Sequence, residues 1–508
     1  MKKRIKQLYK GCSLLIFIVL LCSCELPEDK EEYEQEISPV YAPVETPTIT
    51  LTAKPTEPVT NEPIEPTVIP TKPIKEPVPN CSPTPVAINP LDGAYWRDRY
   101  VDATAELMTQ KEIAFVNEKN FRADGTNLVK LSEWETIEAA KVLQMITSYS
   151  FPKLKYYDNR EISSADKEAI YNARNMEALQ RAEWVEPTYG ILVRNADLRS
   201  FPTEKHLTTT MNGRYDYLQE TVLLLNEAVI VLHTSLDGEW CFVQAENYYG
   251  WISEDAIAYC SKEDMVEWYE MMWDTESHAF LLVTKNGVYE TEEEPFVLRM
   301  GTRLSYEERE EGELAIVLPA RDEDKKLKKK RYVVKTYTDE FEKSFHRGYV
   351  PYTRSNIVAL TTELLDTPYA WGDAFSYETE GVAGYTIGMD CSSTVAAVYR
   401  CFGFVLPRNT GAQRNMACEG YDMTEESLAA RSKTLDELET GALLYSPGHV
   451  MVYLGKVDDE YYVLHNTTTE FLPDGTEEAF YRCVITTMSL GKSGETIVDQ
   501  LVAVKVLE

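Results

Sequence analysis

The sequence predicts a multidomain α+β protein with a mostly helical N-terminal region, two small β-rich domains, and a C-terminal domain that combines a helix with an antiparallel hairpin. The chain has 508 residues, which is enough for about three domains. Its hydrophobic fraction of 44% supplies several packed cores. Helical apolar spacing and short β-rich runs occupy separate stretches, as expected for this fold class.

Basic residues precede a short apolar run at the N-terminus. Residues 1–10 include five Lys or Arg residues, and Ser13–Leu21 is apolar, which is typical of an export signal. The run ends in Leu-Cys-Ser-Cys, which resembles a bacterial lipobox. The resemblance implies acylation of Cys24, so residues 1–24 are expected to be a lipoprotein-type signal; an ordinary secretory peptide is the alternative. The mature chain is then extracytoplasmic, anchored to the membrane by lipid and facing the wall or periplasm.

Proline dominates residues 25–91. Of the 25 prolines, 14 lie between Ser38 and Pro90, separated mainly by Thr, Glu, Val and Ile. Such a segment favours polyproline II at about 3.1 Å per residue, so it is expected to be a disordered linker that extends on the order of 150 Å. We interpret it as a stalk that holds the folded part of the chain away from the membrane; a linker without that role is the alternative.

Charge and cysteine content exclude other classes of function. The formal net charge of −32 argues against nucleic acid as a partner, because duplex binding depends on neutralising phosphates. Of the ten cysteines, three lie in the first 24 residues. The other seven are scattered, without the close pairs of a zinc site or redox motif. We expect no metal, no cofactor and a monomer.

Residues 92–185 are predicted to form a mostly helical N-terminal stabilising region. Ala105–Asn117 and Trp134–Ile146 have helical apolar spacing. Ser163 followed by Asp166 predicts a capped helix that continues to about residue 180.

Residues 186–262 contain short β-runs separated by turn sequences. Their motifs, Asp-Gly-x-Trp-x-x-Val and Tyr-x-Gly-Trp-Ile, resemble a bacterial SH3-like barrel. Residues 275–345 resemble a second, divergent barrel, with a hairpin signal at Asn286–Gly287. The basic run Lys325–Arg331 is expected in a turn, as solvated charge or as a contact to anionic wall polymer.

The strongest chemical signal in residues 350–508 is Cys391. An apolar helical stripe follows it and ends near Gly403: Val395, Val398, Tyr399 and Phe402. Cys391 therefore lies in the first turn, where backbone N–H groups and the helix dipole favour the nucleophilic thiolate. A cysteine before such a helix is more often a small buried residue, so this position alone does not establish catalysis.

Two of the six histidines supply partners for the thiol. His449 and His465 lie in strand-like segments, and a hairpin centred on residue 457 would place them directly opposite, with Cβ atoms about 5 Å apart. A thiol nucleophile needs a base and a group that orients the base. We expect His449 to accept the Cys391 proton and His465 to orient it; a structural histidine pair is the alternative.

These segments resemble the NlpC-type cell-wall cysteine peptidases, whose fold is a rearranged papain-like fold. The matching motifs lie in order: Tyr369–Gly372, Asp390–Ser393, Pro407–Gln413, Gly448–Val450 and His465. With the preceding domains, the chain resembles the multidomain γ-D-glutamyl-L-diamino acid endopeptidases. The resemblance implies hydrolysis of the bond between D-Glu and diaminopimelate or Lys in peptidoglycan stem peptides or muropeptides.

The resemblance also assigns residues that contact substrate. Tyr369 matches the tyrosine near the oxyanion, and the Cys391 backbone N–H would serve the oxyanion hole. Four positions match the pocket for a free substrate amine: Asp390, Ser392, Asn409 and Thr410. In such enzymes the first barrel helps to select this amine, and the candidates here are Trp240, Tyr248 and Tyr249.

The sequence departs from the family pattern near this pocket. Asp373 stands where a second glycine is usual, and a long loop, residues 374–389, separates Trp371 from Cys391. Asn409 replaces an aspartate found in one version of the amine pocket. A neutral amide pairs less strongly with an ammonium than a carboxylate does, which weakens the expected selection for a free amine.

Other functions stay open. An N-acetylmuramoyl-L-alanine amidase or a thiol acyltransferase would keep the cysteine chemistry and change the bond. A non-catalytic wall-binding protein would use the SH3-like barrels beside an inactive peptidase fold, although the joint presence of Cys391, His449 and His465 favours an enzyme. A metallopeptidase is disfavoured because no HExxH motif is present.

Overall fold

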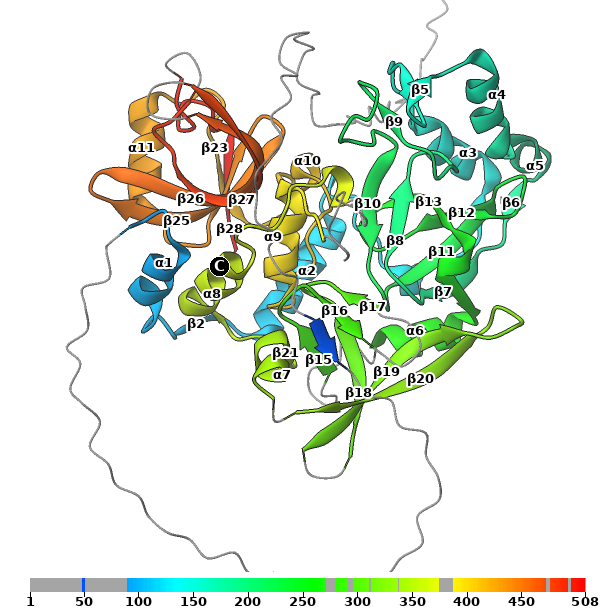
Figure 1. Ribbon diagram of the computed structural model, residues 1–508, viewed down its shortest axis with the longest axis horizontal. Helices are drawn as coiled ribbons and strands as arrows, with labels where there is room; N and C mark the ends of the chain where they lie inside the picture. Colours follow the sequence, from blue (N-terminus) through cyan, green and yellow to red (C-terminus); the bar gives the residue numbers. More distant parts are fainter. Residues whose placement is uncertain are drawn as a thin grey trace, which may run out of the picture.

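The computed structural model describes residues 48–50, 89–270, 280–290, 296–309, 312–336, 338–373, 387–471, 476–491 and 495–507. The predicted signal, Cys24 and most of the predicted linker lie outside these residues. Within the linker, Thr48–Thr50 (β1) pairs in parallel with Gly287–Glu290 (β16). Helices and sheets together confirm the predicted α+β class (Figure 1).

The N-terminal region contains five helices and is divided between two cores. The helices are α1 (Gly93–Tyr100), α2 (Gln110–Arg122), α3 (Ala139–Ser148), α4 (Ser164–Ala173) and α5 (Met176–Arg181). Trp96 of α1 and Ile113 of α2 are buried in the core that contains Cys391. Val142 of α3 and Leu179 of α5 are buried against the first β-rich domain. The region therefore stabilises two different domains.

Helix boundaries in this region differ from those predicted. Helix α2 begins only after Thr109, because Thr109 and Glu112 form a capping box, and Glu106–Met108 (β2) instead pairs with Tyr352–Thr353 (β22). The predicted Ser163–Asp166 capping box is confirmed. The predicted helix breaks at Asn175, whose φ of 53° is left-handed. Short strands complete the region: β3 (Ile137–Glu138), β4 (Tyr156–Tyr157), β5 (Arg160–Glu161) and β6 (Trp184–Val185).

The first β-rich domain is a seven-stranded sheet with the order β10-β8-β13-β12-β11-β7-β14. Its strands are β7 (Thr188–Leu192), β8 (Ala196–Arg199), β10 (Gln219–Leu223), β11 (Ala228–Thr234), β12 (Trp240–Gln244), β13 (Tyr249–Ser253) and β14 (Ile257–Cys260). Ile230 faces one apolar core and Val231 the other, so both faces of the sheet are buried. Strand β9 (Leu207–Thr208) pairs with β4, and α6 (Lys262–Glu270) follows β14.

The second β-rich domain has a five-stranded sheet with the order β20-β19-β18-β15-β21. Its strands are β15 (Phe280–Val283), β18 (Arg303–Glu308), β19 (Glu313–Arg321), β20 (Leu327–Lys335) and β21 (Phe345–Arg347). Strands β16 and β17 (Phe296–Leu298) pair with each other, and α7 (Asp339–Ser344) precedes β21.

Two local predictions for this domain were wrong. Asn286–Gly287 does not turn a hairpin, because β15 pairs with β18 and β21, and the Asn286 side chain accepts a hydrogen bond from the Met300 N–H at 2.8 Å. The run Lys325–Arg331 lies mainly in β20, an edge strand, rather than in a turn. Lysines on an edge strand oppose pairing with another chain.

The C-terminal domain packs helices on a six-stranded antiparallel sheet with the order β23-β28-β24-β25-β26-β27. Its strands are β23 (Glu419–Asp422), β24 (Leu443–Ser446), β25 (His449–Val457), β26 (Glu460–Phe471), β27 (Glu477–Thr487) and β28 (Ala503–Val506). Its helices are α8 (Arg354–Glu363), α9 (Cys391–Arg400), α10 (Thr410–Gln413) and α11 (Leu428–Glu437). Helix α9 packs against β25 and β26, as Figure 1 shows.

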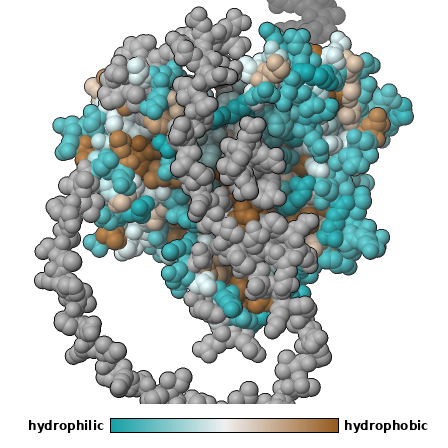
Figure 2. Space-filling model, viewed as in Figure 1, coloured by the Kyte–Doolittle hydropathy of each residue, from teal (hydrophilic) through white to brown (hydrophobic). Residues whose placement is uncertain are grey.

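The described surface is mostly hydrophilic in the view of Figure 2, where apolar side chains gather only in small patches. This agrees with the large net negative charge. No helix in the described part of the chain is long and apolar enough to cross a membrane.

Candidate active site

Cys391 is the first residue of α9, as the sequence predicted. The carboxylate of Asp390 caps the helix by accepting a hydrogen bond from the Ser393 N–H at 2.9 Å, and the Ser393 hydroxyl oxygen accepts from the Asp390 N–H at 3.0 Å. The thiol is buried, and its Sγ lies 3.7 Å from Oγ1 of Thr410. The helix dipole therefore acts on a thiol that is shielded from water.

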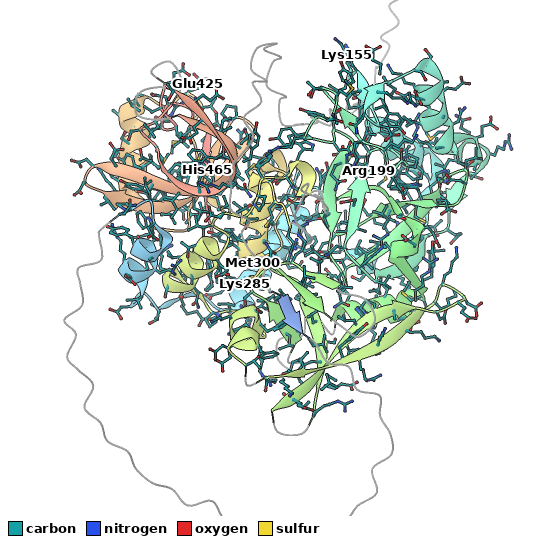
Figure 3. The ribbon with its side chains drawn as sticks, in the orientation of Figure 1. Lys155, Arg199, Lys285, Met300, Glu425 and His465 are labelled. Atoms are coloured by element: carbon teal, nitrogen blue, oxygen red, sulfur yellow. The ribbon has the colours of Figure 1, made fainter. Side chains whose placement is uncertain are left out.

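His449 and His465 are hydrogen-bonded to each other. His449 Nε2 lies 2.8 Å from His465 Nδ1, and the ring centroids are 5.0 Å apart at an interplanar angle of 67°. His465 projects from the sheet of the C-terminal domain (Figure 3). Because Nε2 of His449 is occupied, its Nδ1 is the nitrogen that remains for the thiol proton. The predicted juxtaposition of the two imidazoles is confirmed.

The predicted register of the hairpin was wrong by two residues. Tyr453 pairs with Val463 instead of Tyr461, because the register shifts next to Gly455 and the turn is formed by Asp458–Asp459. On the histidine side of Gly455 the shift is two residues, and an even shift leaves these side chains on their expected face. The two histidines therefore still meet, although they are diagonal neighbours rather than directly opposite.

Thr486 on β27 extends this pair into a chain of three groups. Its Oγ1 lies 3.2 Å from His465 Nε2. If Nδ1 of His449 is to accept a proton, Nε2 of His449 donates to Nδ1 of His465, and Nε2 of His465 donates to Thr486. The sequence prediction missed Thr486, because it belongs to no motif and lies on a third strand, so only the sheet topology brings it to the site.

Burial keeps both imidazoles neutral. It lowers the pKa of His449 to about 4, although the nearby carboxylate of Asp390 acts in the opposite direction. Burial also lowers the pKa of His465 well below its usual value, and the charge of a protonated His449 adds to this. A neutral His449 is the form that accepts a proton from a thiol. His449 is the first residue of β25, a strand that packs against α9.

The four predicted pocket residues surround Cys391, but their side chains already have partners within the protein. Arg408 donates to Asp390 Oδ2 at 2.7 Å and to the Ser392 hydroxyl at 2.9 Å. Asn409 caps α10 by accepting from the Ala412 N–H at 2.9 Å. The negative charge of Asp390 is thus balanced by a buried arginine, which reduces its pull on an ammonium.

Tyr369, predicted to lie near the oxyanion, is next to the segment that enters α9. It forms an isolated parallel bridge with Met389, and its N–H donates to the Tyr481 carbonyl at 2.8 Å. Its ring lies 5.9 Å from that of Tyr215 in the first β-rich domain. The two domains therefore meet beside this tyrosine.

Comparisons with known proteins assign both kinds of domain. Residues 366–474 match the model of the NlpC/P60 family. The chain carries an NlpC/P60 domain. Residues 208–253 match the model of an SH3 domain of the SH3b1 type, inside the predicted first barrel. These matches confirm the family resemblance seen in the sequence.

Individual relatives match to different extents. A segment of 103 residues is 29% identical to dipeptidyl-peptidase 6 of Lysinibacillus sphaericus, and this segment is 20% of the chain and 30% of that protein. The structure of an NlpC/P60 endopeptidase from Photobacterium damselae subsp. piscicida superposes with a TM-score of 0.63 at 16% identity, over 81% of this chain and 96% of that one. An NlpC/P60 family protein from Bacillus cereus has a TM-score of 0.42 at 17% identity, over 63% of this chain and 99% of that one. The Photobacterium structure confirms the predicted multidomain fold with its papain-like domain.

The NlpC/P60 domain faces Glu220 and Tyr248 of the SH3 domain. The Tyr248 hydroxyl donates to Glu220 Oε2 at 2.8 Å, and the charge of Arg408 acts on the same carboxyl. Burial raises the pKa of Glu220 to about 7. Glu220 was missed in the sequence; the only signal is a polar triplet, residues 219–221, at the start of an apolar strand.

The other two candidates from the first barrel do not face the NlpC/P60 domain. Trp240 belongs to the barrel core, and the Tyr249 hydroxyl lies 3.1 Å from Ser148 Oγ in the N-terminal region. Among the described residues, no three His, Cys, Asp or Glu side chains are placed to hold a metal ion.

Proposed function

We propose that the protein is a cysteine peptidase that hydrolyses the γ-D-glutamyl–diamino acid bond of peptidoglycan stem peptides or muropeptides. The observation that carries this proposal is the hydrogen-bonded His449–His465 pair on β25 and β26, the two strands against which the helix that begins at Cys391 packs. A base held by a second group beside a thiol is the arrangement required for nucleophilic catalysis by cysteine.

In the proposed mechanism, His449 Nδ1 takes the proton of Cys391, and the thiolate attacks the γ-carbonyl of D-Glu. The Cys391 backbone N–H and Tyr369 stabilise the oxyanion. His449 then gives its proton to the departing amine of the diamino acid, which leaves a thioester on Cys391. Water activated by His449 hydrolyses the thioester and restores the free thiol, while His465 keeps His449 in one tautomer.

Asp390, Ser392, Asn409 and Thr410 form the proposed substrate pocket, joined by Glu220 and Tyr248 from the SH3 domain. Two acidic side chains at this junction support recognition of a free N-terminal amine on L-Ala. Because Arg408 balances Asp390 and burial keeps much of Glu220 protonated near neutral pH, we expect this preference to be modest. The name of the Lysinibacillus relative, a dipeptidyl-peptidase, supports release of a dipeptide.

We further propose that the protein acts outside the cytoplasm as a monomer, held to the membrane by lipid on Cys24. The charged and apolar N-terminal sequence, the lipobox-like Leu-Cys-Ser-Cys and the proline-rich segment support this location. Cys24→Ala is expected to move the protein from the membrane fraction to the soluble fraction, measured by fractionation. An unchanged membrane fraction would contradict lipid anchoring.

Digestion of defined muropeptides followed by mass spectrometry tests the reaction. We expect the wild type to release L-Ala-γ-D-Glu, and Cys391→Ala to release none. Cys401→Ala is the matched control, because Cys401 is also buried at α9 but at its far end, and this variant is expected to stay active. Intact stem peptides freed from sugar would instead identify an amidase, and cleavage by Cys391→Ala would exclude Cys391 as the nucleophile.

A further inference from the structure

Asp373 occupies a left-handed backbone position. Gly372 and Asp373 both have φ of 60°, in the region where glycine is unstrained. Most L-residues pay about 1–2 kcal/mol there, and aspartate is among the few that adopt this conformation, because its carboxylate can form local hydrogen bonds. The carboxyl is also buried, and burial raises its pKa. An aspartate in a left-handed and buried position indicates that its carboxyl group has a specific role.

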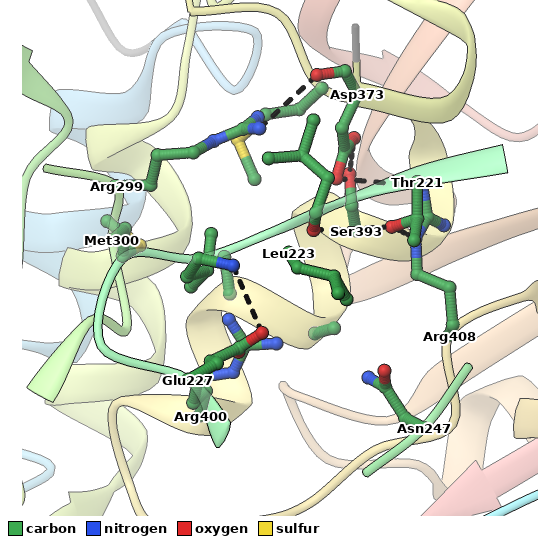
Figure 4. A pocket seen from close by; sticks show the side chains of 15 residues that line it. Thr221, Leu223, Glu227, Asn247, Arg299, Met300, Asp373, Ser393, Arg400 and Arg408 are labelled. Carbon is green, nitrogen blue, oxygen red and sulfur yellow. Dashed lines mark hydrogen bonds and ion pairs between the residues drawn. The ribbon is translucent and has the colours of Figure 1, made fainter. Parts of the chain in front are cut away.

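The carboxylate of Asp373 contacts the start of the nucleophile helix directly. Its Oδ1 accepts hydrogen bonds from the Asp390 N–H at 2.9 Å and from the Ser393 hydroxyl. Its Oδ2 lies 3.6 Å from Nη2 of Arg408, the arginine that also holds Asp390 at 2.7 Å. Asp373 therefore binds the residues on both sides of Cys391 in the first turn, and Figure 4 shows it beside Ser393.

Two arginines and one strand of the SH3 domain hold the segment that carries this carboxylate. Arg299 donates to the Asp373 carbonyl at 3.3 Å, so it approaches from the second β-rich domain. Nε of Arg408 donates to the Thr221 hydroxyl on β10, and Gln219 donates to the Gly372 carbonyl at 3.2 Å. Thr221, Arg299, Asp373 and Arg408 line one pocket, together with residues of α9. Asp373 is thus held directly by Arg299 and Arg408, and the SH3 domain holds its neighbour Gly372 and its partner Arg408.

We propose that Asp373 is a positioning residue for Cys391, which fixes the first turn of α9 and shares the positive charge of Arg408 with Asp390. This inference rests on the proposed role of Cys391 as nucleophile. Three charged groups act on the Asp373 carboxyl: the cations Arg408 and Arg299, and the anion Asp390. Asp390 also acts on His449. Without the Asp373 charge, more of the Arg408 charge remains to stabilise a thiolate at the start of the helix.

Two substitutions separate charge from geometry. Asp373→Asn keeps an oxygen acceptor and removes the charge. The pH at which iodoacetamide alkylates Cys391 at half its maximal rate is therefore expected to fall by about one unit. The kcat of this variant is expected to change less than threefold. Asp373→Gly relieves the backbone but removes every side-chain contact. It is expected to lower kcat at least tenfold with a smaller change in KM, although its thermal midpoint is retained within a few degrees.

Asp366 supplies matched controls. It also has a left-handed φ, of 62°, and its carboxylate pairs with Arg482 at 3.0 Å, but it is largely exposed and lies outside the site. Asp366→Asn and Asp366→Gly are expected to leave alkylation and kcat unchanged. Cys391→Ala in each background corrects for labelling of other cysteines.

A purely structural role for Asp373 would change the thermal midpoint of both variants and leave the alkylation profile and kcat as in the wild type; that result would overturn the proposal. Alkylation of Cys391 needs no substrate. The alkylation profile therefore tests the role of Asp373 even if the proposed peptidase function is wrong. Should Cys391→Ala still cleave muropeptides, the reaction assignment fails, whereas the measured link between Asp373 and the thiol is unaffected.

Discussion

At the scale of single residues, the chain from His449 through His465 to Thr486 determines where protons lie in the site. Motif matching identified the two histidines, because their spacing and strand pattern are local in sequence. It could not identify Thr486 or Asp373. Thr486 reaches His465 only because β27 pairs with β26, and Asp373 acts through tertiary contacts with Asp390, Ser393 and Arg408 that the family motifs do not include.

Thr486→Val removes the acceptor for His465 and leaves a similar volume. We expect kcat to fall roughly fivefold to tenfold, since the net worth of a hydrogen bond is about 1 kcal/mol. Thr486→Ser keeps the hydroxyl and should restore most of the activity. The control is Thr487→Val, whose hydroxyl bonds Glu460 instead. Equal rates for the Val and Ser variants at residue 486 would refute the role of the hydroxyl.

The depressed pKa of His449 predicts the acid limb of the pH–rate profile. As pH falls through this pKa, His449 is protonated and can no longer accept the thiol proton, so kcat/KM declines. Because the pKa is lowered to about 4, activity is expected to persist at pH 5–6, where a histidine with the ordinary value of 6.5 is largely protonated. A decline centred near pH 6.5 would show that burial does not control this residue.

At the scale of elements, the β25–β26 hairpin shows what a sequence pattern can and cannot determine. Alternation fixed which face each histidine occupies, and this prediction was correct. The predicted register was not correct, because the register depends on Gly455, whose φ is 133°. A Cβ at this position would lie 3.2 Å from the Tyr100 hydroxyl and 3.3 Å from the Trp96 ring. That contact comes from α1, more than 350 residues earlier, so no local pattern reveals it.

The turn of this hairpin uses two aspartates with positive φ, 47° at Asp458 and 66° at Asp459. Asn-Gly is favoured in such a turn, so Asp458→Asn combined with Asp459→Gly is expected to raise the unfolding free energy by about 0.5–1 kcal/mol. Denaturant unfolding measures this change. Asp324→Gly is the control, because Asp324 lies in the β19–β20 turn but does not itself have a positive φ. This variant should not raise the unfolding free energy. A lower midpoint for the double variant would contradict the strain argument.

At the scale of the whole molecule, composition shifts predicted the order of the domains, but not how the N-terminal helices divide between two of them. The division depends on which core has room for Trp96 and which for Val142, and this is decided only when the domains pack. The family resemblance led us to expect the first barrel at the substrate pocket and named Tyr248 there. It did not identify the contacts that join β10 to residues 372 and 408, because those residues are far apart in the sequence.

Glu246 connects the packing of domains to pH. It lines a pocket between the first barrel, α6 and the NlpC/P60 domain, and burial raises its pKa to about 7. Because the folded state holds this proton more tightly than the unfolded state, the stabilisation is full below the unfolded pKa near 4.5 and is lost as pH rises through about 7.

Glu246→Gln is therefore expected to flatten the pH dependence of stability between about pH 5 and 8, by up to about 1.4 kcal/mol per pH unit. Urea unfolding at several pH values measures the effect. Glu239→Gln, at an exposed position beside β12, is the control. If the unfolding free energies of the wild type and Glu246→Gln change with pH in parallel, this carboxyl does not couple domain packing to pH.

The position of α1 has a consequence for biosynthesis. Its Trp96 is buried between Tyr462 of β26 and the rest of the C-terminal core, yet it is made more than 350 residues before that strand. During synthesis or export, the Trp96 indole cannot be buried in the C-terminal core until nearly the whole chain has emerged. A fragment starting at residue 350 would leave that site uncovered, so the C-terminal domain completes its core last and only with α1 in place.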